Sequence, residues 1–323
     1  LTGKDKDSYK TVLNLIFEHQ SSEGWYMEYE GPDPGYQTLC THYLSVLYSK
    51  TKDKRLKESL QKSLHYLYHF VHPDKTIGGL YGSRNTEVYY PGGLNLLASK
   101  SKEARHIALH LNMGVAKGNA VLPQDIDADN YVPLLNSYAL AALYEDKVNL
   151  NDDDLIPFFK RGIQKNFEKS GIELFSNSSY FSILNYRKGG TLKVFNLSTS
   201  KCEFDSGGVF YFKNKKILTS QRHDPNIEKD NTGSFKINLH QYKEQYPSLT
   251  DTIIIRILAL TVFRFIFLAE LFKKLIVKVL MTNKLKSKYN SIVKVTYNAH
   301  YVGIEYDFNN YTQKDKLVLD KKL

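Results

Sequence analysis

The sequence predicts a multidomain α+β protein, with a helical domain at residues 1–168 followed by a β-rich domain at residues 169–323. From Ser8 to about Phe167, apolar residues recur every three or four positions, the spacing of one face of a helix. After Lys169 the apolar segments are short and rich in β-branched and aromatic residues. A chain of 323 residues with 42% apolar content is long enough for two such domains.

Six helices are predicted in the first domain. The clearest spans 56–71, with Leu or Val at every third or fourth position, and it ends at the His72-Pro73 pair. The other helices are expected at 12–16, 39–47, 104–113, 134–144 and 155–163. The fifth of the six is expected to begin just after Pro133, since proline is favoured in the first turn. Six helices joined by loops predict stacked helical hairpins.

Strands are predicted in the second domain, where short apolar segments are separated by Gly, Asn and Ser turns. Four strands are expected at 180–186, 191–197, 208–213 and 216–220. The pattern returns at 292–297 and 302–308, with the spacing of an antiparallel hairpin. The second domain is therefore expected to form an antiparallel sheet or sandwich that continues to the end of the sequence.

An apolar segment at 253–281 interrupts this pattern. It contains Arg256, Arg264 and several further charges, too many for a transmembrane helix. Five of its charged residues fall within an arc of about 120° at 100° per residue, which is compatible with a basic amphipathic helix in peripheral contact with a membrane. A helix or strand pair packed on the sandwich is the preferred explanation of the segment, and the peripheral membrane contact stays open as the alternative.

The charge balance favours polyanionic partners. Lys and Arg number 44 against 34 Asp and Glu, a net charge of +10. Nucleic acid, uronic acid polysaccharides and an anionic membrane are all partners that suit such a charge. The charge can equally reflect a lysine-rich composition that has no functional meaning. No nucleic-acid-binding motif and no phosphate-binding glycine loop is found, so nucleic acid is not expected as a partner.

The two cysteines, Cys40 and Cys202, form neither a disulfide framework nor a zinc motif. Both are expected to be buried small apolar residues, in a helix and in a strand respectively. No metal and no cofactor is expected. The sequence opens without the apolar core of a signal peptide, and no compartment is predicted from it.

The loops between residues 24 and 98 are unusually rich in aromatic and polar residues. Loops rarely keep such large side chains unless they line a binding site. Trp and Tyr offer flat faces for sugar rings, while Arg, Asn, Asp and Glu suit carboxylates and hydroxyls. A carbohydrate-binding cleft fits this chemistry.

Within these loops, the segments EYEGPDPGYQTL at 28–39, HPD at 72–74 and GLYGSRNT at 79–86 resemble heparinase II/III-like proteins of bacterial polysaccharide gene sets. The resemblance covers about residues 20–100. It implies a complete or incomplete α/α toroid followed by a β-sandwich, and an acidic polysaccharide or oligosaccharide as substrate. It also implies a bacterial cytoplasmic or periplasmic protein. Six helices give only three hairpins, fewer than toroids of this class usually contain.

The resemblance further implies lyase-type β-elimination. This reaction needs a group that neutralises the uronate carboxylate, a base for the C5 proton and an acid for the leaving oxygen. Arg84 and Asn85 are the candidates for neutralisation. Tyr36, His72 and Tyr81 are the candidates for base and acid. Six further residues are expected to bind substrate: Trp25, Glu28, Glu30, Asp33, Gln37 and Glu87.

Other interpretations remain open for the same residues. A glycoside hydrolase would use two of the carboxylates of Glu28, Glu30, Asp33 and Glu87, and a polysaccharide-binding or assembly protein would keep the cleft without the chemistry. Structural roles are equally open. Arg84-Asn85 would brace a loop, His72 would end its helix, the tyrosines would pack and Trp25 would anchor the core.

Overall fold

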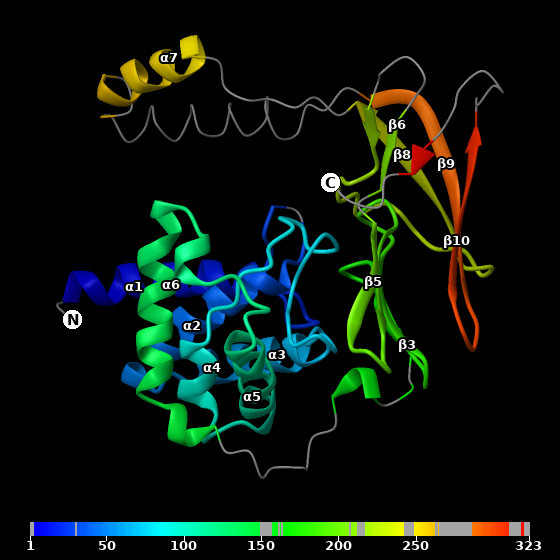
Figure 1. Cartoon of the computed structure of the whole chain (residues 1–323). Helices are drawn as coiled ribbons and strands as arrows, with labels where there is room; N and C mark the ends of the chain where they lie inside the picture. The colour runs from blue at the N-terminus through cyan, green and yellow to red at the C-terminus, as the bar shows by residue number, and fades with distance from the viewer. Residues whose placement is uncertain are drawn as a thin grey trace.

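The computed structural model describes residues 3–29, 31–148, 157–160, 162, 164–206, 208–211, 217–241, 249–261, 264, 286–309 and 318–319. The described chain is a mixed α+β protein with seven α-helices and two antiparallel sheets (Figure 1). The α+β prediction is therefore confirmed, and the helices precede the strands apart from the last helix.

The helices are α1 (Gly3–Glu18), α2 (Pro34–Thr51), α3 (Lys54–Tyr68), α4 (Gly92–Leu97), α5 (Lys102–Ala116), α6 (Ala128–Ala142) and α7 (Leu249–Leu260). The predicted helix at 155–163 appears only as a 3-10 turn at Phe158–Lys160 in the described residues. Helix α6 begins at Ala128, so the predicted start after Pro133 is wrong. The Asp127 carboxylate caps α6 by accepting hydrogen bonds from the backbone of Asp129 and Asn130.

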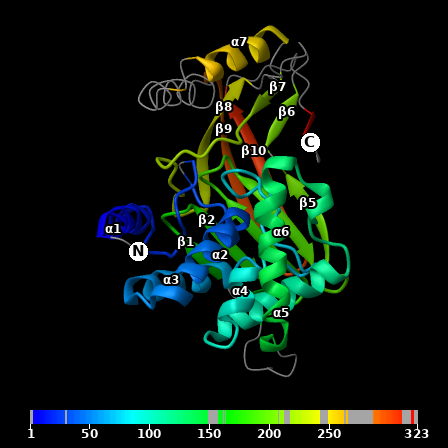
Figure 2. The same cartoon turned by 90° about the vertical axis from the view of Figure 1, so that its left-hand side faces the viewer.

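Helix α4 was not predicted, because the Gly92-Gly93 pair has the composition of a turn. A Cβ atom on Gly93 would lie 2.5 Å from the backbone of His42, so glycine here allows α4 to pack directly against α2. Its glycines therefore serve close helix packing and not a turn. The described helices α2 to α6 pack side by side without establishing a closed ring (Figure 2).

The first sheet has the strand order β1-β2-β3-β4-β5. Its strands are β1 (Gln164–Phe167), β2 (Ile172–Ser176), β3 (Tyr180–Asn185), β4 (Thr191–Asn196) and β5 (Lys201–Ser206). The second sheet has the order β10-β9-β8-β7-β6-β11. Its strands are β6 (Val209–Tyr211), β7 (Ile217–Thr219), β8 (Ser234–Gln241), β9 (Lys286–Tyr297), β10 (Val302–Asn309) and β11 (Val318–Leu319). The predicted hairpin of β9 and β10 is confirmed.

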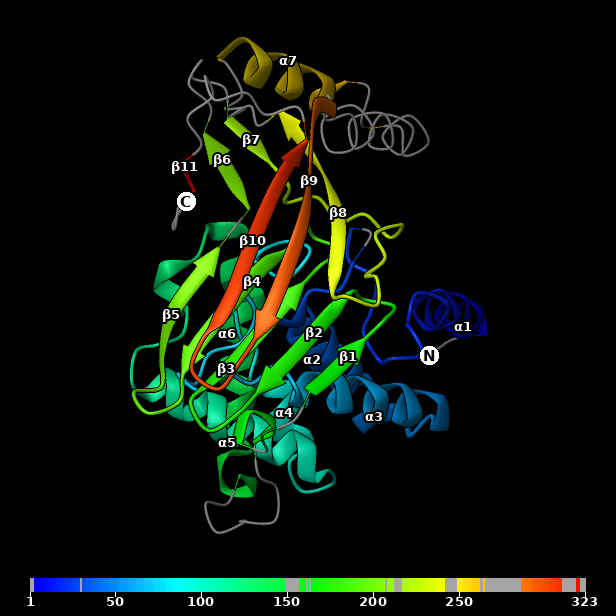
Figure 3. The same ribbon diagram turned by 90° about the vertical axis from the view of Figure 1, so that its right-hand side faces the viewer.

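The first sheet lies between the helices and the second sheet, and this makes a three-layer arrangement (Figures 1 and 3). Every residue of β3 is buried. Phe181 and Ile183 belong to the core shared with the helices, whereas Leu184 belongs to the core shared with the second sheet. Because successive side chains of a strand point to opposite faces, β3 contributes to both cores.

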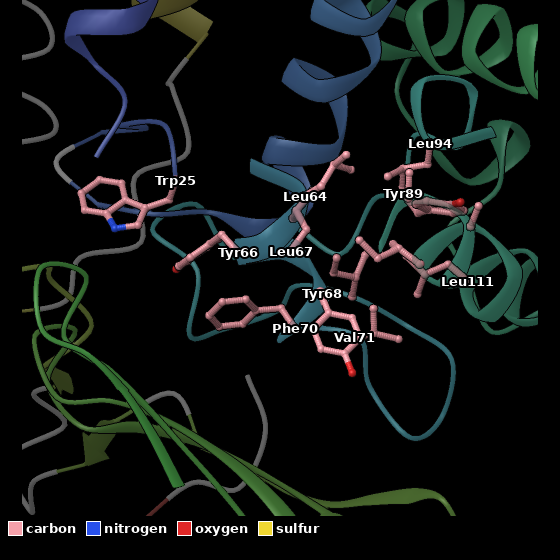
Figure 4. Packing of buried hydrophobic residues seen from close by; sticks show 14 of the residues in the cluster. Trp25, Leu64, Tyr66, Leu67, Tyr68, Phe70, Val71, Tyr89, Leu94 and Leu111 are labelled. Atoms are coloured by element: carbon pink, nitrogen blue, oxygen red, sulfur yellow. The ribbon is translucent and has the colours of Figure 1, made fainter. Parts of the chain in front are cut away.

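The helices and the first sheet share one hydrophobic core. Phe70 and Tyr81 from the helical part pack with Phe167 and Phe195 from the sheet. Figure 4 shows the helical side of this core, with Tyr66 and Phe70 beside each other and Trp25 at its margin. The predicted boundary near residue 168 thus falls at the end of β1, inside a continuous core, and two separate domains stay a prediction.

The segment predicted at 253–281 is described only in part. Residues 253–260 belong to helix α7, and Arg264 is also described. The remainder of 253–281, apart from residue 261, lies outside the described residues. Among the described helices, none has the length and apolarity needed to span a bilayer.

Replacing Phe181 by Ala tests the shared core. The buried ring contacts Phe159 and Phe195, so its removal is expected to lower the free energy of unfolding by about 3–5 kcal/mol. Urea unfolding of the full chain measures the change. Tyr301→Ala, at an exposed position, should change it by less than about 0.5 kcal/mol. Equal effects of the two substitutions would contradict the shared core.

Candidate functional site

A groove runs between the loops of the helical part and the edge strand β5. Its inner end is a cavity of about 740 Å³, and its outer end is a cavity of about 720 Å³. The two cavities share Asp74, Thr76, Asn119 and Cys202, so we treat them as one helix–sheet groove. Its combined volume is large enough for an oligosaccharide.

Lys193 occupies the inner end of the helix–sheet groove. Its Nζ lies 3.2 Å from Glu87 Oε1 and 3.2 Å from Asp205 Oδ2, and its side chain is 6% exposed. Leu192 and Val194 face the second sheet, so the alternation of β4 turns Lys193 toward the helices. A Cβ atom on Gly79 would lie 2.7 Å from Lys193 Nζ, so glycine at this position leaves room for the ammonium group.

The two carboxylates and Lys193 affect one another's ionisation. Burial lowers the pKa of Lys193, but the charges of Asp205 and Glu87 outweigh burial and raise it. Burial raises the pKa of Asp205 despite the neighbouring ammonium group. Asp205 Oδ1 is buried and has no hydrogen-bond partner among the described residues. Asp205 therefore holds a proton more readily than an exposed aspartate does.

A second buried lysine holds the loop that forms the groove wall. The Lys188 ammonium group donates hydrogen bonds to the Gly82 carbonyl, to Asn85 Oδ1 and, at 2.6 Å, to the Leu80 carbonyl. Asn185 Nδ2 donates to the Tyr81 carbonyl at 2.8 Å. Polar side chains of β3 and of the turn between β3 and β4 thus fix the 80–85 loop.

Three residues in the left-handed backbone region line the groove. They are Lys75 at φ 70°, Asn85 at φ 59° and Ser200 at φ 56°. This conformation is unfavourable for residues other than glycine, and such residues concentrate at binding sites. Their presence supports a functional role for the groove.

Lysines gather at the outer end of the groove. Lys75, Lys117 and Lys201 line it with a single carboxylate, Asp74. Burial and the like charges of Lys117 and Lys160 lower the pKa of Lys75. An anionic ligand would relieve this repulsion.

The predicted catalytic residues His72 and Tyr81 meet, but inside the core. His72 Nε2 lies 2.8 Å from the Tyr81 hydroxyl, and both residues are 0% exposed. Burial lowers the pKa of His72 well below its ordinary value and raises that of Tyr81 well above it. Both groups are therefore neutral, and neither can touch a ligand directly.

A hydrogen-bond chain connects this pair to the groove. The Tyr81 hydroxyl accepts from the Gly78 N–H at 3.1 Å, which leaves its own proton for His72 Nε2. His72 Nδ1 then lies 2.9 Å from Thr76 Oγ1, which donates to Asp74 Oδ1 at 2.6 Å. Asp74 lines the groove. The buried pair thus orients a carboxylate at the groove surface.

Arg84 and Tyr36 lie at a different place. Arg84 Nη1 pairs with Glu28 Oε1 at 3.0 Å, and its guanidinium group stacks over Tyr36 at 4.1 Å and Tyr29 at 4.7 Å. Tyr36 and Glu28 line a separate cavity of about 390 Å³, together with Asp33 and Gln37. These contacts are those of a loop brace, with Glu28 as the charged partner.

Tyr36 and Asn85, two of the predicted catalytic residues, therefore line different cavities. The Asp33 carboxylate fixes the loop by accepting the Arg84 N–H at 2.8 Å and the Thr86 N–H at 3.4 Å. The left-handed turn at Asn85 then sends its side chain to Lys188 and the groove. Of the predicted site residues, Asn85 and Glu87 line the helix–sheet groove.

Three predicted substrate-binding residues are held by structural contacts. Asp33 is buried and caps α2 through the Tyr36 N–H at 3.0 Å. Gln37 is buried and donates to Ser63 Oγ at 2.9 Å. Trp25 is buried in the core, with 6% of its surface exposed, and it donates to Glu23 Oε2 at 2.9 Å, so little of its ring is left for a sugar to contact. Glu30 lies outside the described residues.

The cysteine prediction is half wrong. Cys40 is partly buried in α2, whereas Cys202 is exposed on β5. Strand β5 is at the edge of the first sheet, and so Cys202 is not enclosed between two layers. Among the described residues, no group of side chains suited to hold a metal ion is found.

Lys193, Asp205 and Lys188 were missed by the sequence prediction. The one available signal was Lys193 itself, a charged residue between Leu192 and Val194 in a predicted strand. Such a lysine must face solvent or a partner, but no sequence pattern identifies Glu87, more than 100 residues away, as that partner.

No protein-family model matches the chain, and no curated protein matches its sequence. The resemblance to heparinase II/III-like proteins therefore stays a prediction, as do the roles that it implies for individual residues.

Arg84→Ala separates a brace from a catalytic group. A brace at this half-exposed position should stabilise the fold by about 1 kcal/mol, from one ion pair and aromatic stacking. We expect a small drop in melting temperature and unchanged ligand binding in the groove. A loss of turnover of about a hundredfold or more with unchanged stability would instead support the neutralising role.

The buried histidines predict acid instability. Burial lowers the pKa of His69, His110 and His223 from 6.5 to about 4, and it lowers the pKa of His72 well below its ordinary value. Below pH 6.5 the unfolded chain takes up protons that the folded chain cannot, so the free energy of unfolding should fall between about pH 6.5 and pH 4.

Urea unfolding at a series of pH values measures this slope. His72→Gln should reduce the slope, while His300→Gln on an exposed turn serves as the control. If His72→Gln left the slope unchanged, burial of neutral His72 would not contribute to the acid instability.

Proposed function

We propose that the chain is a carbohydrate-active protein that takes an acidic oligosaccharide in the helix–sheet groove and cleaves it by β-elimination. The observation that carries the proposal is the groove itself, with three lysines at its outer end and Lys193 between two carboxylates at its inner end. Repeated anionic groups of a polymer would contact the outer lysines, because ammonium groups at a concave surface attract such ligands.

Elimination at a uronate would proceed at the inner end. Lys193 would neutralise the uronate carboxylate, with Asn85 beside it on the groove wall. This neutralisation matters most as C5 loses its proton, because negative charge then spreads onto the carboxylate. To bind the substrate carboxylate, Lys193 would have to give up part of its contact with Glu87 or Asp205.

The proton transfers would use carboxylates of the groove. Asp74 would accept the C5 proton, oriented by the chain from Tyr81 through His72 and Thr76. Asp205, whose pKa is raised by burial, would protonate the leaving oxygen as the C4–O bond breaks and the C4–C5 double bond forms. His72 and Tyr81 would then position Asp74, and they would not themselves act as the acid and base predicted from the sequence.

The fold implied by the resemblance belongs to the same proposal. Helices α2 to α6 would be part of an incomplete α/α toroid, and the two sheets would form the accompanying β-sandwich. The face-to-face packing of the sheets around Leu184, Phe235 and Val293 supports the sandwich.

Hydrolysis is the second candidate, because two carboxylates flank Lys193 at the inner end of the groove. Glu87 Oε1 and Asp205 Oδ2 each lie 3.2 Å from Lys193 Nζ, so they are at most twice that, about 6.4 Å, apart. Retaining glycosidases hold two carboxyl groups about 5–5.5 Å apart, with one of raised pKa as the acid. Asp205 would then be the acid and Glu87 the nucleophile.

Product analysis on a panel of uronate polymers tests the proposal. Elimination leaves an unsaturated uronate that absorbs ultraviolet light, whereas hydrolysis releases reducing ends without it. Unsaturated product from the wild-type chain is expected. Reducing ends alone would favour hydrolysis, and binding without any product would favour a polysaccharide-binding protein.

Two variants examine the inner and outer ends of the groove. Lys193→Gln should lower kcat about a hundredfold or more, because it removes transition-state neutralisation. Lys117→Gln with Lys201→Gln should raise KM with little change in kcat, because those lysines are distant from the reacting bond. Lys50→Met, at an exposed position of α2, serves as the control. An unchanged kcat in folded Lys193→Gln protein would exclude the proposed role.

A further inference from the structure

The cavity of about 390 Å³ beside α2 lies apart from the helix–sheet groove and shares no lining residue with it. Its volume is within the range of small-molecule binding sites. Helix α1, the first turns of α2 and the loop between the two helices form its wall, so we call it the α1–α2 cavity. The lining residues are Val12, Leu15, Ile16, His19, Tyr26, Met27, Glu28, Asp33, Tyr36, Gln37 and Cys40.

Much of the wall of the α1–α2 cavity is apolar, and part of it is open to solvent. Val12, Leu15 and Met27 are 55%, 50% and 52% exposed. Ile16 and Tyr26 are partly buried beside them. An apolar ligand in the cavity would remove these side chains from water, which is favourable. The apolar wall alone does not select a ligand, so the polar groups of the cavity have to decide its chemistry.

Gln37 supplies the polar group that lacks a partner. Its side chain is 3% exposed, and its Oε1 has no hydrogen-bond partner among the described residues. Gln37 Nε2 donates to Ser63 Oγ at 2.9 Å and to the Gly24 carbonyl at 3.2 Å. A carbonyl oxygen can only accept, so the Gly24 contact fixes which end of the amide is Nε2. Neither Ser63 nor Gly24 lines the cavity, and so Oε1 is the end of the amide left for a ligand.

The two carboxylates of the cavity already have partners. Glu28 Oε1 pairs with Arg84 Nη1 at 3.0 Å. The Asp33 carboxylate accepts hydrogen bonds from three backbone N–H groups. No lysine or arginine is among the residues that line the cavity. A charged ligand would therefore lose its hydration without gaining an unpaired ion as partner, whereas an uncharged donor would satisfy Gln37 Oε1.

We propose that the α1–α2 cavity binds an uncharged alcohol with an apolar body. The hydroxyl group donates to Gln37 Oε1, and the apolar body covers Val12, Leu15 and Met27. An alcohol meets both requirements, because it offers a hydrogen-bond donor without burying a charge. This site is independent of the helix–sheet groove and of the function proposed for it.

Binding of 2-naphthol to the full chain, measured by equilibrium dialysis at neutral pH, tests the proposal. Three matched probes keep the naphthalene ring. Among them, 2-methoxynaphthalene keeps the oxygen but cannot donate, 2-naphthoate is an anion and 2-naphthylmethylammonium is a cation. We expect 2-naphthol to bind at least about tenfold more tightly than each of the three, because it alone satisfies the buried acceptor without burying a charge.

Two variants locate the binding site. In folded Gln37→Leu protein, the preference for 2-naphthol over 2-methoxynaphthalene should disappear. Gln37 also holds Ser63, so Leu15→Asp, at a half-exposed position of the wall, provides a variant that keeps the buried contacts. It should weaken binding of 2-naphthol at least about tenfold, because it places a charge against the apolar body. Leu143→Asp, at a 75% exposed position away from the cavity, should leave binding unchanged.

Four outcomes would overturn the proposal. They are no binding of 2-naphthol up to its solubility limit, equal affinity for 2-naphthol and 2-methoxynaphthalene, tighter binding of either charged probe, and binding of 2-naphthol that Leu15→Asp leaves unchanged. The last outcome would place 2-naphthol elsewhere on the protein.

Discussion

Burial of the first sheet on both faces is the constraint on which the rest of the structure depends. Its strand β3 contributes alternate side chains to the helical core and to the core of the second sheet. A sheet in this position can carry a polar side chain on its helix-facing side only if a partner is supplied there. Asn185 of β3 and Lys193 of β4 are such side chains, and Lys188 lies in the turn between these two strands. The loops of the helical part supply partners to all three.

The groove follows from this requirement. Lys188 and Asn185 fix the 80–85 loop by its backbone carbonyls, and Asp33 fixes the same loop from the other side through backbone N–H groups. The loop therefore has little freedom, and its left-handed residue Asn85 is held in an unfavourable conformation by contacts on both sides. Lys193, by contrast, pairs with two carboxylates at a cavity wall, and a ligand could replace these contacts.

The aromatic and polar loops that made residues 24–98 unusual divide into two sets. One set, with Arg84, Tyr36 and Glu28, forms a brace around a small cavity near α2. The other, with Asp74, Asn85 and Glu87, faces the sheet and lines the groove. His72 and Tyr81 belong to neither surface, and they support Asp74 from within the core. A single loop sequence thus combines structural and groove-lining roles at adjacent positions.

The sequence by itself determined the order of elements, because periodicities of 3.6 and 2 are local properties of the chain. It predicted most helices, the strands β3, β4, β6 and β7, and the hairpin of β9 and β10. It also identified Asn85 and Glu87 among the candidate residues. The short α4 escaped prediction because the use of Gly93 depends on the approach of α2.

Only the tertiary structure decided which polar residues meet. Lys193 and Glu87 are 106 positions apart, and their pairing depends on the packing of the first sheet against the helices. Tertiary packing likewise covered Trp25, enclosed His72 with Tyr81 and turned Arg84 away from Asn85. Burial and long-range contact arise from the packing of whole layers, so the local pattern around any one of these residues cannot determine them.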